Sequence, residues 1–267
     1  MAADPGAEDP AREIQRLSRR VHRLEETLEG VESIRDSNRK LLDRLMQDLD
    51  AERTRSRDLL LNVLPASIVA RLDSGETLIA DRHERVAVVL SDFVSFTEIA
   101  GRLTPADLVH QLDALFSAFD AACEVHGLEK IKTIGDAYMA AAGLEASPAD
   151  PCIAAAGLAL DMLEAVAATH GAWRVRVGIH VGPLVAGVIG SRKFAFDIWG
   201  DCVNMASRLE QTAVPGRIQV SQAVAEALGA GFVLESRGRV ELKGKGLVET
   251  WFLLGRAAPL AEAGAGA

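Results

Sequence analysis

Two aspartates are the residues of this chain with the clearest capacity for chemistry. Asp92 ends the apolar run Ala87-Val-Val-Leu-Ser, and Asp136 follows Gly135 between two apolar segments. A carboxylate at the end of a buried strand is unfavourable unless it is solvated, paired or bound to a cation. Two converging carboxylates would hold hard divalent cations of the kind used in phosphoryl chemistry. The alternatives are that Asp92 only caps a helix and that Asp136 only shapes a turn.

A second group of polar residues lies between residues 193 and 210. Asn204 and Arg208 are four residues apart, so they share one face of a predicted helix. An amide and a guanidinium placed in this way can orient a ribose and neutralise a phosphate. The alternative is a solvated helix face on which Arg208 has Glu210 as its neighbour.

The segments around these residues alternate between strand and helix patterns. A strand at about 84–91 precedes a helix that Thr104 caps and that ends at Gly127. The other predicted elements are strands near 128–134, 137–143, 173–180, 184–190, 232–242 and 248–254, and helices from Asp150, over 202–212 and from Ser221. The order β-α-β-β-α-β predicts an α+β, ferredoxin-like core, with one sheet covered by two helices on one face. Such a core brings the end of the first strand beside the hairpin tip, and thus Asp92 beside Asp136.

The N-terminal part of the chain has a different pattern. Residues 1–11 are small and acidic with two prolines, which is typical of disorder. Residues 12–62 lack proline and predict a long coiled-coil helix, or alternatively one amphipathic helix packed on the globular domain. The predicted a and d positions are Ile14, Leu17, Val21, Leu24, Leu28, Val31, Arg35, Asn38, Leu42, Leu45 and Leu49. The polar pair Arg35 and Asn38 interrupts this stripe, which suits a helix pair that must adjust.

The remaining boundaries follow from composition. Residues 63–82 read as a linker with a short helix from Pro65 to Leu72, residues 83–256 as the globular domain and residues 257–267 as a disordered Ala/Gly tail. The net charge of -9 argues against a nucleic-acid surface. We expect no membrane span, because no apolar run approaches about 20 residues. Three scattered cysteines and an acidic N-terminus without signal-peptide features predict a cytoplasmic protein.

Four blocks of the sequence, in order, resemble the catalytic domain of the class III nucleotidyl cyclases, the adenylate and guanylate cyclase family. The blocks are Ser-Asp92-Phe-Val-Ser-Phe-Thr, Lys132-Thr-Ile-Gly-Asp136-Ala-Tyr-Met, Phe-Asp197-Ile-Trp-Gly-Asp-Cys-Val-Asn204-Met-Ala-Ser-Arg208 and Leu242-Lys243-Gly-Lys-Gly. The resemblance covers about residues 83–256. One such block would be weak, but four in the family's order are specific.

The resemblance implies a role for each matching residue. It implies that two divalent cations, Mg or Mn, are held by the side chains of Asp92 and Asp136 and by the carbonyl of Phe93. It implies further that Phe96 and Thr97 lie in the substrate-binding stretch, that Lys132 and Asp197 read the purine, that Asn204 and Arg208 stabilise the transition state, and that Lys243 meets the terminal phosphates. In the family the site lies in a head-to-tail dimer, so we expect a homodimer with two composite sites.

The choice of base can be argued from atoms. Adenine presents an acceptor at N1 and a donor amine at N6, whereas guanine presents the reverse. Lysine only donates and an ionised aspartate only accepts, so Lys132 with Asp197 complements adenine. Guanylate cyclases of the family typically carry Glu and Cys or a similar residue there. The expected enzyme is therefore an adenylate cyclase that forms cyclic AMP and pyrophosphate from ATP; a guanylate cyclase and a catalytically silent nucleotide-binding dimer are the alternatives.

Three positions depart from the family's common pattern. Phe93 stands in place of an isoleucine, Ser95 in place of a glycine, and Pro183 where some members have an arginine near the phosphates. Phosphate binding would therefore depend on Lys243, the loop amides and the cations. The coiled coil suggests that an upstream sensor or a partner regulates the catalytic domain through this helix.

Overall fold

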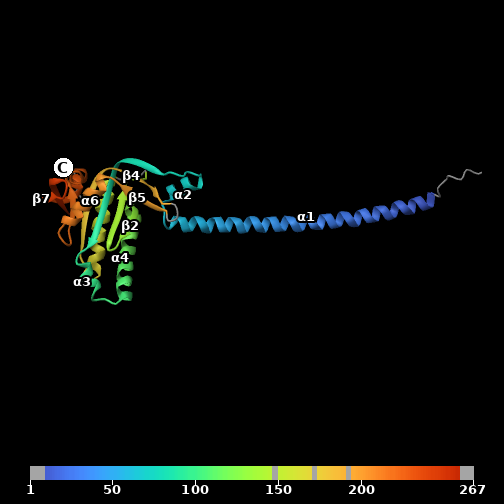
Figure 1. The fold of residues 1–267 in the computed structure, drawn as a ribbon, viewed down its shortest axis with the longest axis horizontal. Helices are drawn as coiled ribbons and strands as arrows, with labels where there is room; N and C mark the ends of the chain where they lie inside the picture. The colour runs from blue at the N-terminus through green and yellow to red at the C-terminus, as the bar shows by residue number, and fades with distance from the viewer. Residues whose placement is uncertain (1–9, 146–149, 170–172, 191–193, 259–267) are drawn as a thin grey trace, which may run out of the picture. The chain divides into compact units, whose positions relative to one another are not determined.

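The computed structural model of the chain describes residues 10–145, 150–169, 173–190 and 194–258 (Figure 1). The chain divides into two compact units, with the boundary between Asn62 and Val63. The first unit is one long helix, α1 (Pro10–Leu61), which begins two residues before the predicted start. The predicted disorder of residues 1–9 and of the tail from residue 259 lies outside the described residues.

The second unit contains a mixed sheet and its helices. Its helices are α2 (Ala66–Asp73), α3 (Phe96–Ala100), α4 (Pro105–His126), α5 (Pro151–Ala168), α6 (Asp201–Thr212) and α7 (Gln222–Leu228), with a 3-10 turn at Gly229–Gly231. Its strands are β1 (Ala80–Phe93), β2 (Glu129–Ile134), β3 (Ala137–Ala142), β4 (Val175–Ile189), β5 (Ala195–Trp199), β6 (Ile218–Ser221), β7 (Phe232–Leu242) and β8 (Gly246–Arg256). The strand order is β2-β3-β1-β4-β6-β8-β7, and β5 pairs with β4.

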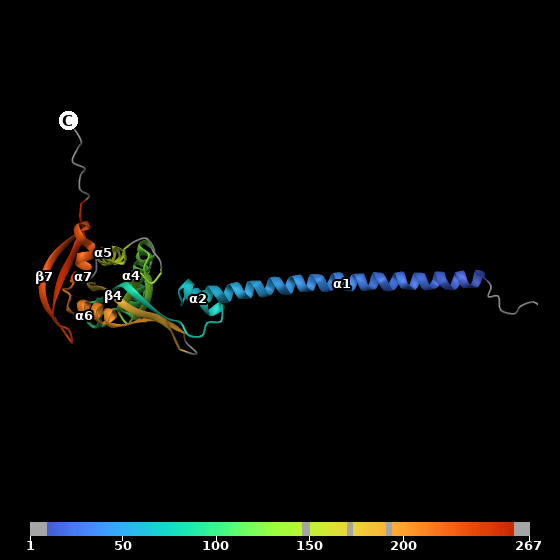
Figure 2. The same ribbon diagram turned by 90° about the horizontal axis from the view of Figure 1, so that it is seen from above.

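The predicted ferredoxin-like core is confirmed. The strands β2, β3, β1 and β4 are neighbours in that order, and each pair is antiparallel. The helix α4 joins β1 to β2 and the helix α5 joins β3 to β4. Thr104 caps α4 by accepting a hydrogen bond from the Asp107 amide, and Gly127 ends the helix with φ 69°. Figures 1 and 2 show β7 at the far end of the sheet from α4.

Two details of the predicted strands are wrong. The segments near 173–180 and 184–190 form one strand, β4, because Pro183 lies opposite an irregularity of β1. The register passes from Gly182 opposite Val86 to Leu184 opposite His83. Pro183, which has no amide hydrogen, is therefore not required to donate a hydrogen bond to β1. The short strands β5 and β6 were not predicted, since each depends on pairing with β4.

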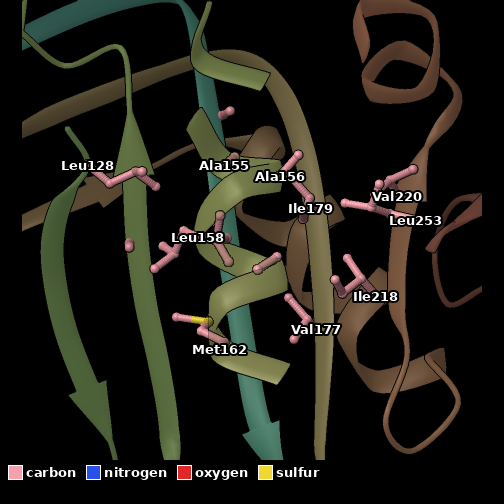
Figure 3. Close-up of a cluster of buried hydrophobic side chains, with 14 of the residues drawn as sticks. Leu128, Ala155, Ala156, Leu158, Met162, Val177, Ile179, Ile218, Val220 and Leu253 are labelled. Carbon is pink, nitrogen blue, oxygen red and sulfur yellow. The ribbon is translucent and has the colours of Figure 1, made fainter. Parts of the chain in front are cut away.

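The main core lies between one face of the sheet and the helices α4 and α5. Figure 3 shows Leu158 and Met162 of α5 beside Val177 and Ile179 of β4. These four side chains are completely buried. The alternation of apolar residues along β4 directs Val175, Val177 and Ile179 into this core, as expected for a strand with one face on helices.

The helix α5 is also the one described helix whose length and composition would allow it to cross a membrane. Half of that window is buried inside the protein, where Ala155, Leu158 and Met162 contribute to the core. A buried core helix satisfies the same test, so this match is weak support for a membrane span.

The helix α6, which follows the βαββαβ core in the chain, lies on the opposite face of the sheet from α4 and α5. A Cβ atom added to Gly178 of β4 would lie 2.2 Å from the Glu210 amide nitrogen and 2.5 Å from the Ala206 carbonyl oxygen. The backbone of α6 therefore lies directly on β4, in a position that a side chain at residue 178 would prevent.

We predict that Gly178→Ala destabilises the protein by about 3 kcal/mol or more, because neither α6 nor β4 can move without breaking backbone contacts. Urea unfolding followed by circular dichroism measures this change. Gly255→Ala is the matched control, since Gly255 also lies in a strand and an added Cβ there meets no atom within 4 Å. Equal free energies of unfolding for the two variants would contradict the direct contact between the backbones of α6 and β4.

Candidate active site

The two aspartates of the predicted metal site lie side by side. Asp92 is opposite Ala137 in the β1–β3 pairing, and Asp136 immediately precedes Ala137 in the turn after Gly135, whose φ is 64°. Burial raises the pKa of Asp136, and the Asp92 carboxylate, within hydrogen-bonding reach, raises it further. The fold thus holds two acidic groups together although they repel each other.

A guanidinium lies against this carboxylate pair. Arg176 of β4 is opposite Asp92 of β1, and its Nη2 donates a hydrogen bond of 2.8 Å to Asp92 Oδ2. Its Nε lies 3.3 Å from Oε1 of Glu210, which belongs to α6. Arg176 therefore lies between a predicted metal ligand and a third carboxylate.

Glu210 is the one charged residue that is buried in the described part of the chain, with 7% of its surface exposed. Burial raises the pKa of Glu210 to about 7; Arg176 lowers it, and Asp92 and Asp136 add to the rise. The alternative of a solvated Arg208–Glu210 face is therefore wrong, because Glu210 faces β4 and Arg208 donates instead to Gln211, at 2.8 Å. The helical spacing of Cys202, Ala206 and Leu209 places Glu210 on the apolar face, and this signal in the sequence was missed.

The acidic cluster has the chemistry of a divalent-cation site. Within the described residues, three carboxylates, Asp92, Asp136 and Glu210, act on one another electrostatically, and Arg176 is the cation that offsets them. These three carboxylates are not arranged as joint ligands, because no group of three His, Cys, Asp or Glu side chains in the described chain could hold a metal. A cation here would therefore be held by the pair Asp92 and Asp136. Two carboxylates with additional oxygen ligands from backbone and substrate suit Mg²⁺, which keeps few protein ligands.

The loop after Asp92 is anchored in the core. The Phe93 ring is buried and lies 5.2 Å from the ring of Trp173, which fixes the position of the adjoining carbonyl group. Ser95 has φ 55°, the only positive φ of a described residue other than glycine. This left-handed conformation explains the glycine that is common in the family, since a side chain there costs about 1 kcal/mol.

The two predicted substrate-binding residues of α3 differ in exposure. The Phe96 ring packs 6.1 Å from Trp173, so a contact of Phe96 with substrate would come from its backbone. Thr97 is exposed.

The predicted purine-reading residues form an ion pair. Lys132 Nζ of β2 donates to Asp197 Oδ2 of β5 at 2.5 Å, and the Ile198 amide donates to Asp197 Oδ1 at 2.9 Å. The Asp197 side chain is 15% exposed and that of Lys132 is 37% exposed. One donor and one acceptor are thus fixed next to each other at a partly open position.

The predicted transition-state residues point away from the sheet that carries Asp92. The buried face of α6 includes Cys202 and Ala206, and Asn204 is two residues from each, about 200° around the helix. Asn204 is exposed and Arg208 is half-buried. The structure therefore does not bring Asn204 and Arg208 together with the carboxylate pair of the same chain.

The predicted phosphate-binding lysine lies in the exposed turn between β7 and β8. In this turn Lys245 forms an ion pair with Asp201, at the start of α6, whereas Lys243 has no ionic partner among the described residues. The pairing of Lys245 fixes the turn next to α6 and leaves Lys243 available for an anion.

Comparison with known proteins identifies relatives of both substrate classes. The family model described as "Adenylate and Guanylate cyclase catalytic domain" matches residues 78–255. An adenylate cyclase of Mycobacterium tuberculosis is 48% identical over 213 residues, which are 78% of this chain and 48% of that protein. Mouse guanylate cyclase D is 38% identical over 87% of this chain and 22% of its own length. The chain thus spans about half the length of the mycobacterial relative.

A solved structure has the same fold as the second unit. It is the guanylate cyclase domain of RhGC from Catenaria anguillulae in complex with GTP, with 33% identity and a TM-score of 0.63. The match covers 66% of this chain and all of that one. The same fold therefore occurs in a protein that binds GTP, and residues within the site must decide the base.

We predict that Glu210→Gln changes how stability depends on pH. The folded-state pKa of Glu210, about 7, lies above its usual value of 4.5, so the folded protein retains this proton more strongly. The stability that folding gains from this stronger proton binding is fully present below about pH 4.5, and it is lost as the pH rises through 7. The variant should gain on the order of 2–3 kcal/mol relative to the wild type between about pH 5 and pH 8. Urea unfolding at several pH values measures the gain, and a constant difference would contradict it.

Proposed function

The chain belongs to the adenylate and guanylate cyclase catalytic domain family, and we propose that it is an adenylate cyclase that converts ATP into 3′,5′-cyclic AMP and pyrophosphate. The pair formed by Lys132 and Asp197 carries the choice of ATP. In the reaction the ribose 3′-hydroxyl gives its proton to the solvent and its oxygen attacks the α-phosphorus, the bond from this phosphorus to the bridging oxygen breaks, and pyrophosphate leaves.

The base preference rests on complementary hydrogen bonds. The Lys132 ammonium would donate to adenine N1 and the Asp197 carboxylate would accept from the N6 amine. Guanine would place a donor against the lysine and an acceptor against the aspartate. Such mismatches leave polar groups unpaired, and each costs about 1–3 kcal/mol in a partly buried site. The 48% identity to a mycobacterial adenylate cyclase agrees with this choice.

The carboxylates Asp92 and Asp136, with the carbonyl of Phe93, would hold two divalent cations. When bound, these cations would acidify the 3′-hydroxyl and offset the charge of the phosphates. Arg208 would donate to the oxygens of the α-phosphorus as their charge grows, and Asn204 would orient the ribose. Lys243 and the backbone of the Phe96–Thr97 stretch would bind the terminal phosphates.

The directions of these side chains support a homodimer with shared sites. Asn204 and Arg208 face away from the sheet that carries Asp92, so one chain does not assemble a complete site. The face of β4 and β5 that carries Asp197 also exposes Val185, Ile189 and Trp199, each by more than a third. An exposed apolar face next to half of a site suits contact with a second copy.

The helix α1 would join the two copies as a coiled coil. Its predicted a and d residues are exposed in the single chain, including Ile14 at 68% and Leu28 at 61%. An exposed apolar stripe of this length suits a partner helix. A shift between two such helices would alter the angle between the catalytic domains, which gives an upstream sensor or partner a route to the shared sites.

We predict that Lys132→Glu combined with Asp197→Cys shifts the preference from ATP towards GTP by at least about tenfold per position in kcat/KM. Cyclic AMP and cyclic GMP formed from each nucleotide are measured by chromatography. Lys130→Gln is the matched control, because Lys130 lies on the same strand but pairs with Asp120, at 2.7 Å. An unchanged ratio of cyclic AMP to cyclic GMP formation in the double variant would contradict the assignment of Lys132 and Asp197 as the residues that select the base.

We predict that mixing Asp92→Ala chains with Arg208→Ala chains restores activity, since each heterodimer regains one intact site. Random pairing gives about a quarter of the wild-type sites. Cyclic AMP formation by the mixture is the measurement. A mixture of Asp92→Ala with Asp136→Ala should stay inactive, because both changes lie in the same half of the site. Absence of recovery in the first mixture, with heterodimers demonstrated, would argue against shared sites.

A further inference from the structure

The contacts of Arg176 differ at its two ends. Towards β1, its Nη2 makes a hydrogen bond of 2.8 Å to Asp92. Towards α6, its Nε lies 3.3 Å from Glu210 Oε1, yet both atoms are buried without a hydrogen-bond partner. The guanidinium therefore makes one hydrogen bond to Asp92, whereas its ion pair with Glu210 contains no completed hydrogen bond.

A buried polar atom without a partner is costly, which makes this geometry informative. The exposed fractions of the side chains are 28% for Arg176 and 9% for Glu210, so water screens the pair weakly. A small movement of Arg176 towards α6 would complete the bond to Glu210 and release the Asp92 oxygen. Since Arg176 already lies within 3.3 Å of Glu210, a second position of the guanidinium on that carboxylate would need only a short shift.

A divalent cation on Asp92 would compete with Arg176 for the same oxygen. Arg176 contributes one positive charge beside three carboxylates, and its hydrogen bond orients Asp92. Once a cation binds Asp92, an arginine left there would be repelled by it. Glu210 supplies the carboxylate that would then receive Arg176.

We propose that Arg176 and Glu210 are positioning residues for cation binding: Arg176 holds and orients Asp92, and Glu210 draws Arg176 away when a cation arrives. This inference rests on the proposed function, because it takes Asp92 as a ligand of the catalytic cations. It assigns opposite effects to two neighbouring residues. Glu210 favours cation binding by accepting the arginine, whereas Arg176 opposes cation binding and secures the geometry needed for turnover.

The test measures Mn²⁺ binding to the whole protein in the presence of 3′-deoxy-ATP, which lacks the attacking hydroxyl. The paramagnetic resonance signal of free Mn²⁺ reports the half-saturating concentration at about pH 8.5, above the pKa of Glu210. Glu210→Gln should raise this concentration about three- to tenfold, since Arg176 stays on Asp92. Arg176→Met should lower it about three- to tenfold and also lower kcat with ATP by at least about tenfold, because Asp92 loses its orientation.

A double variant separates this effect from a loss of folding. Arg176→Met leaves Glu210 buried without a partner, whereas Arg176→Met with Glu210→Gln removes both charges. In the Arg176→Met background, Glu210→Gln should change the half-saturating Mn²⁺ concentration by less than about twofold, because Glu210 acts through Arg176. If Arg176→Met does not fold, the double variant is compared with Glu210→Gln alone, and it should bind Mn²⁺ more tightly.

The matched control is the exposed ion pair between Arg239 and Glu249, at 3.0 Å on β7 and β8. Arg239→Met and Glu249→Gln should leave Mn²⁺ binding unchanged. The inference is overturned if Glu210→Gln leaves Mn²⁺ binding within twofold of the wild type, or if both single variants shift it in the same direction. Cyclic AMP formation by the wild type distinguishes this failure from a failure of the proposed function, which would remove that activity altogether.

Discussion

The direct contact between the backbones of α6 and β4 is the constraint on which the rest of the site depends. It exists because Gly178 has no side chain, so Ala206 and Glu210 approach the strand more closely than any Cβ would allow. This contact buries Glu210 beside Arg176, and it directs the opposite face of the same helix outward. The contact between α6 and β4 therefore determines the positions of two groups of polar residues, Glu210 with Arg176 on the inner face of α6 and Asn204 with Arg208 on the outer face.

At the acidic end of β1, the fold holds several carboxylates close together although they repel one another. Burial and the neighbouring Asp92 carboxylate raise the pKa of Asp136, and a third carboxylate, Glu210, is buried nearby. A single guanidinium compensates part of this charge, while divalent cations would compensate more. Incomplete neutralisation of this cluster is the physical reason why the proposed site would bind cations, and the hydrogen bond from Arg176 orients Asp92.

Much of the fold followed from local patterns. The continuous apolar run at the end of β1, the Thr104 cap with Pro105 and the Gly127 terminus are local signals, and they predicted the ferredoxin-like core and its helices. The continuous strand β4 was harder to predict from the sequence, because a proline normally ends a strand. Pro183 is tolerated within β4 since it lies opposite the irregularity of β1. The strands β5 and β6 are short, and they form because β4 offers them an edge.

By itself, the sequence determined which side chains are available and predicted their roles: the aspartates 92 and 136 for cations, Lys132 with Asp197 for adenine, and the i, i+4 pair of Asn204 and Arg208 for the transition state. The tertiary structure alone decided which of them meet, because contacts between distant segments depend on strand register and helix packing. It joined Lys132 to Asp197, turned Asn204 and Arg208 away from Asp92, and added Arg176 and Glu210 to the acidic end of the sheet. In the sequence Arg176 and Glu210 are an ordinary strand arginine and an ordinary helix glutamate, and only their burial beside Asp92 reveals a role for them.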